Sequence, residues 1–168
     1  LTFLQGVKLY WQRAQDNTRG TQGLLGGGNL LGGVLDGGRW DLRIEFVETR
    51  DSGAVWYTHP TYTSGLAFKR FLIGHPIGGA ARGLFGRATY YFTPTAWLAG
   101  DGRHERYGFP VQDIPTTQER FGLEASYQFP WKQRLLTLWG RVEYARLEEP
   151  GGEREQTMNV QLSARWRF

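Results

Sequence analysis

Hydrophobic and polar residues alternate strictly along several stretches of this chain. In the last eleven residues, every second residue from Met158 to Phe168 is apolar and every residue between them is polar. The same period of two recurs in four further stretches, 39–46, 82–92, 120–129 and 135–144. Successive side chains of a strand point to opposite faces, so this pattern predicts strands that have one apolar and one polar face.

Three weaker stretches, 3–11, 65–73 and a short 95–101, bring the expected number of strands to about eight. No segment shows a convincing period of 3.6 residues. None approaches the roughly 18 uninterrupted apolar residues of a membrane-spanning helix. The pattern therefore predicts an all-β antiparallel protein.

The expected connections roughly alternate in length. Those near 93–95 and 130–133 are tight, whereas 17–38, 101–118 and 148–155 are long and rich in Gly or polar residues. Short turns at one end and long loops at the other are typical of bacterial outer-membrane barrels. The connection at 47–60 does not fit, because it is long where a short turn is expected.

A soluble antiparallel sandwich also alternates, but three features favour a barrel. The polar faces hold Arg and Glu on neighbouring strands, and the apolar faces include small residues such as Gly86 and Gly140, which fill a dry core poorly. Aromatic residues gather near strand ends, as in the girdles at membrane interfaces. We therefore predict an antiparallel transmembrane β-barrel of outer-membrane type, because closure satisfies the sheet edges in lipid.

In such a barrel the polar side chains face the lumen. The residues expected there are Arg43, Glu45, Arg87, Glu124, Arg141, Glu143, Arg165 and Arg167. They would fill a small closed barrel as ion pairs or line a pore in a larger one. Residues 1–168 would then be a single barrel domain or the C-terminal segment of a larger barrel.

The composition narrows the function classes. The chain has no Cys, so it has neither a disulfide framework nor a thiolate metal site. Its net charge is +4 and its sequence pI about 9.6, but charged residues make up only 21% and form no basic run. We expect no nucleic-acid partner, no metal and no other cofactor.

The stretch 42–92 resembles the capsule assembly Wzi family of outer-membrane proteins. The resemblance is carried by "LRIEFVET", by the Tyr62-to-Gly65 step and above all by "IGHPIGG" at 73–79. Family membership implies a longer protein, of which this chain would be the C-terminal part. It also implies a lectin-like protein that holds capsular or other surface polysaccharide at the bacterial outer membrane without catalysis.

Five residues are candidates for polysaccharide contact, four of them in the expected outer loop 100–113: His75, Arg103, His104, Arg106 and Tyr107. The Arg and His side chains could pair with acidic sugar groups, and Tyr107 could stack on a pyranose ring. Each also has a structural reading: His75 could hold a Gly/Pro turn, and 100–113 could be a solvated loop. The Gly-rich stretch 23–38 lacks the Lys-Ser/Thr ending of a phosphate-binding loop. We expect a mobile outer loop there, and the alternatives are an inward constriction or a contact with a neighbouring chain.

The aromatic C-terminal residue Phe168 resembles the signal that the outer-membrane assembly machinery reads, or it is an interfacial anchor. The partners expected are outer-membrane lipid, surface polysaccharide and that machinery, with further barrel chains or a preceding region completing the wall. An outer-membrane channel is the alternative function, a soluble sandwich lectin is a third, and an enzyme is not expected.

Overall fold

The computed structural model describes residues 4–14, 28–49, 67–68, 71–72, 81–108, 116–131 and 134–167. These residues form strands and turns, and they contain no helix long and apolar enough to cross a membrane. Eight strands make one antiparallel sheet in the order β1-β2-β3-β6-β7-β8-β9-β10. Their bounds are Gly6–Ala14 (β1), Gly28–Asp36 (β2), Trp40–Glu48 (β3), Ala81–Thr93 (β6), Ala96–Tyr107 (β7), Thr116–Trp131 (β8), Arg134–Glu148 (β9) and Arg154–Arg167 (β10). The all-β antiparallel prediction is confirmed.

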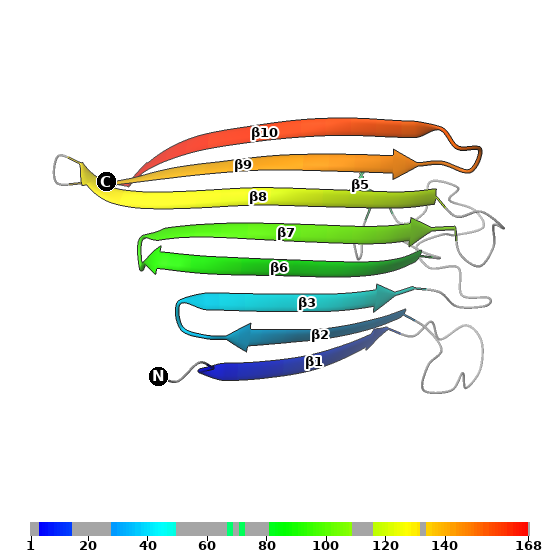
Figure 1. Ribbon diagram of the computed structural model, residues 1–168, viewed down its shortest axis with the longest axis horizontal. Helices are drawn as coiled ribbons and strands as arrows, with labels where there is room; N and C mark the ends of the chain where they lie inside the picture. Colours follow the sequence, from blue (N-terminus) through cyan, green and yellow to red (C-terminus); the bar gives the residue numbers. More distant parts are fainter. Residues whose placement is uncertain are drawn as a thin grey trace.

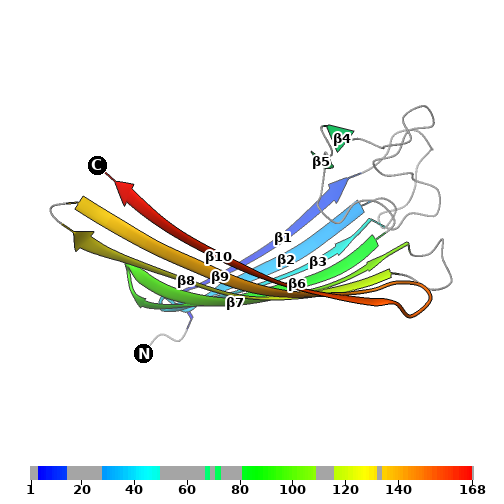
Figure 2. The same ribbon diagram turned by 90° about the horizontal axis from the view of Figure 1, so that it is seen from above.

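The sheet is a single curved layer. Every strand pairs with the strands that precede and follow it in the sheet, so β1 and β10 form the two opposite edges (Figure 1). Seen along its surface, the layer bends into a trough (Figure 2). Among the described residues the only buried hydrophobic side chains are Ala81 and Ala99. The fold therefore buries almost no apolar core of its own.

The register separates an apolar face from a polar face along the six strands from β3 to β10 in the main sheet. One register row of the apolar face is Leu42, Ala88, Gly100, Leu123, Val142 and Val160. The adjacent row on the polar face is Arg43, Arg87, Asp101, Gly122, Glu143 and Asn159. The apolar side chains are exposed, reaching 81% at Leu9 and 82% at Leu162.

The connections at the two ends of the sheet differ in length. The turns β2–β3, β6–β7 and β8–β9 take two or three residues, whereas the connections after β1, β3, β7 and β9 are longer (Figure 1). The long connection that begins at 47–60 joins β3 to β6 and so belongs with the other long ones. Its apparent misfit arose because β2 was not expected.

Three sequence predictions about these elements are wrong. The stretch 23–38, expected as a loop, contains β2. The stretch 65–73, expected as one strand, contains two two-residue strands, Ala67–Phe68 (β4) and Phe71–Leu72 (β5), which pair only with each other. The short strand expected at 95–101 continues to Tyr107, so residues 101–107 are strand and not loop.

Gly32 explains why β2 can lie beside β1. The Tyr10 ring of β1 lies over Gly32, where a Cβ atom would collide with it. The ring crosses β2 in this way, and its hydroxyl donates a hydrogen bond to Glu45 of β3. A glycine at this position therefore lets a polar contact tie the first three strands together.

The β2–β3 turn depends on a second glycine. Gly38 has φ 79°, a left-handed conformation that side chains with a Cβ rarely adopt. Its N–H donates to Asp36 Oδ1 at 2.7 Å, which is a local side-chain turn of the kind that Asp favours. The turn therefore fixes the register of β2 against β3.

Candidate functional site

Five charged side chains form an ion-pair network in the middle of the polar face. Asp101 of β7 has only 4% of its side chain exposed, and both of its oxygens accept hydrogen bonds from Arg141 of β9, at 2.6 and 3.0 Å. Arg87 of β6 lies 3.6 Å from Asp101 and donates to Glu124 of β8 at 2.8 Å. Arg141 also donates to Glu143 at 2.8 Å. Since these contacts reach across an intervening strand, the network ties β6, β7, β8 and β9 together.

Glu124 is held from a further side. The indole N–H of Trp139 donates to its second oxygen at 2.6 Å. Carboxylates enclosed in this way stay paired with guanidinium groups, which offsets the cost of taking both charges out of water. The centre of the polar face is therefore a closed network with its charges already partnered.

A small hollow lies on the polar face nearer the end with the long connections. It has a volume of about 180 Å³, and Phe85 contributes the aromatic ring to its lining. The guanidinium carbons of Arg43 and Arg103 lie 5.9 and 5.0 Å from the centre of this ring. Glu45 and Glu105 complete the charged part of the lining. An aromatic ring beside cations and carboxylates is a surface to which a polyhydroxylated ring can bind.

Two arginines face each other beside this hollow. Arg103 of β7 and Arg120 of β8 are opposite each other in register. Arg120 donates to Gln118 at 3.0 Å, but its Nε is buried without a hydrogen-bond partner among the described residues. Like charges directly opposite each other repel. This place on the polar face is therefore suited to an anionic group between the two guanidinium groups.

Tyr107 is the last residue of β7. It lies five residues beyond Gly102, which is the last glycine on the apolar face of this strand. Its hydroxyl donates to Glu105 at 2.7 Å and lies 3.2 Å from Gln118. These two acceptors hold the phenol as a hydrogen-bond donor at the rim of the polar face.

The comparison with protein families identifies the family to which the chain belongs. The family model described as "Capsule assembly protein Wzi" matches residues 1–162. The chain belongs to the capsule assembly Wzi family. No curated protein and no solved structure matches it. The family predicted from the sequence is thus confirmed; that this Wzi-family chain is the C-terminal part of a barrel stays a prediction.

The structure divides the residues that were expected to contact polysaccharide. Arg103 and Tyr107 lie on the polar face of this Wzi-family sheet, whereas His104 and Arg106 lie on the opposite face of the same strand. The expectation of one shared loop is wrong, because the strand continues through them and alternation separates odd from even positions. His75 lies outside the described residues.

The residues expected to face a lumen share the polar face by register, and Arg43, Glu45, Arg87, Glu124, Arg141 and Glu143 take part in the contacts above. Arg165 is placed on this face by its pairing with Thr137, and the backbone of Arg167 pairs with Leu135 at the end of β10. Sequence reasoning missed Phe85, Asp101 and Arg120. Alternation continued beyond Gly100 and Gly102 would have placed Asp101 with Arg103.

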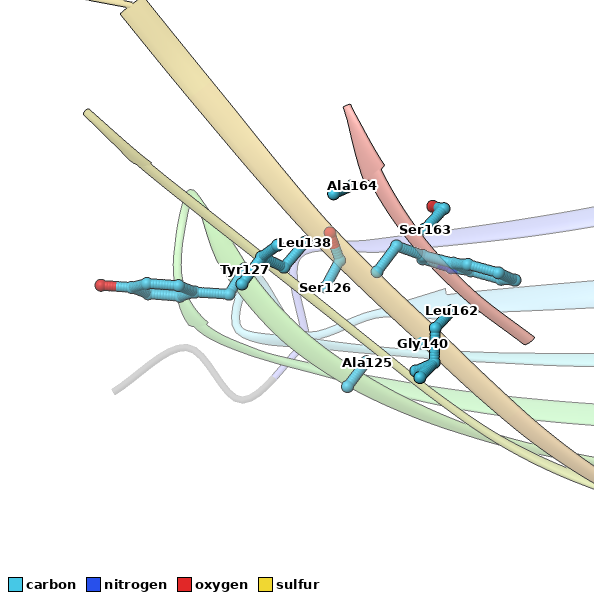
Figure 3. Close-up of a pocket in the computed structure, with 9 residues that line it drawn as sticks. Ala125, Ser126, Tyr127, Leu138, Gly140, Leu162, Ser163 and Ala164 are labelled. Atoms are coloured by element: carbon cyan, nitrogen blue, oxygen red, sulfur yellow. The ribbon is translucent and has the colours of Figure 1, made fainter. Parts of the chain in front are cut away.

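The apolar face offers a different kind of hollow. The small residues Ala125, Gly140 and Ala164 line it together with the larger side chains of Tyr127, Leu138 and Leu162 (Figure 3). Its lining is almost wholly apolar. Such a surface suits hydrocarbon chains and lacks the converging polar groups that a sugar requires.

Within the described residues, no group of three His, Asp or Glu side chains could hold a metal ion.

Proposed function

We propose that this Wzi-family chain forms part of the wall of a barrel in the bacterial outer membrane and binds surface polysaccharide without catalysing a reaction. The exposed apolar face would contact lipid, and the polar face would line the lumen. A single-layer sheet with exposed apolar side chains on one face and an ion-pair network on the other is the observation that carries this placement. In water the same face would be a large aggregation-prone patch.

The length of the apolar band supports the placement. On β8 the apolar face runs from Phe121 to Phe129 without a charged residue. At a rise of about 3.4 Å per residue this is about 27 Å along the strand. A strand tilt of about 40° reduces it to about 21 Å along the membrane normal, close to the band of roughly 25 Å in known outer-membrane barrels.

The polysaccharide would bind on the polar face beside Phe85, not through the charged residues of one outer loop. Phe85 offers a ring for stacking, and Arg103 and Arg120 offer guanidinium groups to a carboxylate. Tyr107 supplies a neutral hydroxyl at the rim. We therefore expect an acidic, uronate-containing polysaccharide to bind better than a neutral one.

The test is binding of a hexuronate-containing capsular polysaccharide to the protein in detergent micelles, compared with its carboxyl-reduced form. Arg103→Gln should weaken binding of the acidic form and leave binding of the reduced form nearly unchanged. Arg106→Gln is the matched control, because it lies three residues away on the opposite face. Equal loss in both variants, or equal affinity for both polysaccharides, would remove this site.

An outer-membrane channel remains the second candidate, because Arg and Glu also line the lumens of channels. The network around Asp101 and Arg141 would argue against a wide pore only if further side chains also blocked the lumen. Single-channel recordings in planar bilayers separate the two functions. Stable conductance steps that vanish in the presence of the polysaccharide would support a channel.

A further inference from the structure

We propose that the outer end of the apolar face binds the phosphate groups of anionic lipid headgroups. This inference rests on the proposed membrane placement. It concerns the face opposite the polysaccharide site and residues that this site does not use. The register row that carries it, here named the charged collar, consists of Glu48, Arg82, Arg106, Thr117, Glu148 and Arg154.

The apolar face changes to charged residues within two register rows. Two register rows below the charged collar, the apolar face carries Ile44, Gly86, Gly102, Phe121, Tyr144 and Met158. From that row to the row of Phe129 and Leu136 near the short turns, the apolar face of β3 to β10 contains no charged residue, whereas the charged collar contains no apolar one. The boundary therefore lies at the same end of six neighbouring strands, the end with the long connections.

Arg82 and Arg106, on adjacent strands, lie at the depth of a headgroup layer. They are two rows, or four residues, beyond Gly86 and Gly102, which is about 14 Å along a strand. With a strand tilt of about 40° this is about 10 Å along the membrane normal. The polar layer of a bilayer adds roughly 5–8 Å to each side of the hydrocarbon core. These two long side chains would therefore reach the headgroups from the outer side of the apolar band.

The cations of the charged collar are all arginines, which bind phosphate through two parallel hydrogen bonds. Arg82 and Arg106 lie directly opposite each other on β6 and β7. Arg82 also lies 3.4 Å from Glu48, whereas the other in-register neighbour of Arg106 is Thr117, which is uncharged. Two opposed guanidinium groups repel, and a phosphate between them would turn this repulsion into attraction.

The rest of the charged collar shows that acids are not its binding groups. Glu148 lies 3.4 Å from Arg146 and 3.2 Å from Arg154, so one carboxylate is shared by two guanidinium groups. The side chain of Arg154 remains 58% exposed. The charged collar and Arg146 thus hold more cationic than anionic groups, on a face that would point towards lipid.

The experiment titrates the protein in non-ionic detergent micelles with an acylated, bisphosphorylated disaccharide lipid and measures bound lipid by native mass spectrometry. The same lipid without its phosphates is the second probe. The phosphorylated lipid should bind more tightly, and the double variant R82Q/R106Q should lose about tenfold in affinity, equivalent to one charge-assisted hydrogen bond. Arg103→Gln, on the other face of β7, should bind the lipid as the wild type does.

Three results would overturn the inference. The first is equal binding of both lipids, the second an equal loss in Arg103→Gln, and the third displacement of the lipid by millimolar inorganic phosphate, which would indicate a site for the free ion. If the wild-type protein inserts into micelles but binds both lipids equally, only this inference fails. If it stays dispersed in buffer without detergent, the proposed membrane placement fails as well.

Discussion

Removing the Arg141 guanidinium tests whether the ion-pair network stabilises the sheet. In Arg141→Gln, Asp101 keeps Arg87 at 3.6 Å as its one ion-pair partner among the described residues, although its side chain is 4% exposed. Removing one partner of a buried ion pair costs about 3–5 kcal/mol. Because Arg87 remains and Arg141 itself is 19% exposed, we expect a loss of about 2–3 kcal/mol in the free energy of unfolding.

The assay is urea unfolding of the protein in lipid vesicles, followed by tryptophan fluorescence. The midpoint should fall while the slope stays constant, because the surface exposed on unfolding is unchanged. Asp101→Asn combined with Arg141→Gln should cost clearly less than the sum of the two single changes, since the two residues share one contact. Arg165→Gln is the control on the same face and should show no measurable loss. Additive single changes, or equal losses in Arg141→Gln and Arg165→Gln, would refute the reasoning.

Three further predictions follow from other parts of the sheet. Gly32→Val should displace the Tyr10 ring and cost about 1–3 kcal/mol of unfolding free energy by urea titration, whereas a neutral result would show that β1 repacks easily. Leu162→Arg, midway along the apolar side of β10, should cost about 2–4 kcal/mol in lipid vesicles, and Asn159→Arg, on the polar side of β10 opposite Glu143, should cost much less; equal costs would contradict the assignment of the lipid-facing side. The 168-residue chain refolded in micelles should give a β-strand circular dichroism spectrum without a heat-dependent gel shift, because β1 and β10 lie at opposite edges; a shift would show that the chain closes its own barrel.

Strict alternation made most strands predictable. Where one face of a strand is apolar and the other polar, as in 158–168, apolar and polar residues alternate because the two faces meet different environments. In β2 this signal is missing, because Leu30 and Leu31 lie on opposite faces and glycines occupy both faces as well. The expected number of eight strands agrees with the main sheet only because this missed strand offsets the wrongly expected strand at 65–73.

The candidate site was harder to predict than the fold. Gly100 and Gly102 hide the apolar face of β7, so the charged residues that follow resembled a loop. The sequence does show that Arg103 and Arg106 differ by three positions, which in a strand places them on opposite faces. The sequence does not show that β2 lies between β1 and β3. It also does not show that Arg103 lies opposite Arg120, because this pairing depends on the observed register of β7 and β8.

The apolar band does not follow the register rows across the sheet. At the end with the long connections, the row through Trp11, Leu31, Phe46 and Leu84 is apolar, but the same row continues as His104, Glu119, Arg146 and Gln156. At the opposite end the band reaches Trp40 on β3 but extends to Phe129 on β8, two rows further. Both boundaries shift in the same direction, as they would where a flat bilayer crosses inclined strands. Under the proposed membrane placement, the distribution of apolar and charged residues along this chain therefore gives the direction in which its strands lean.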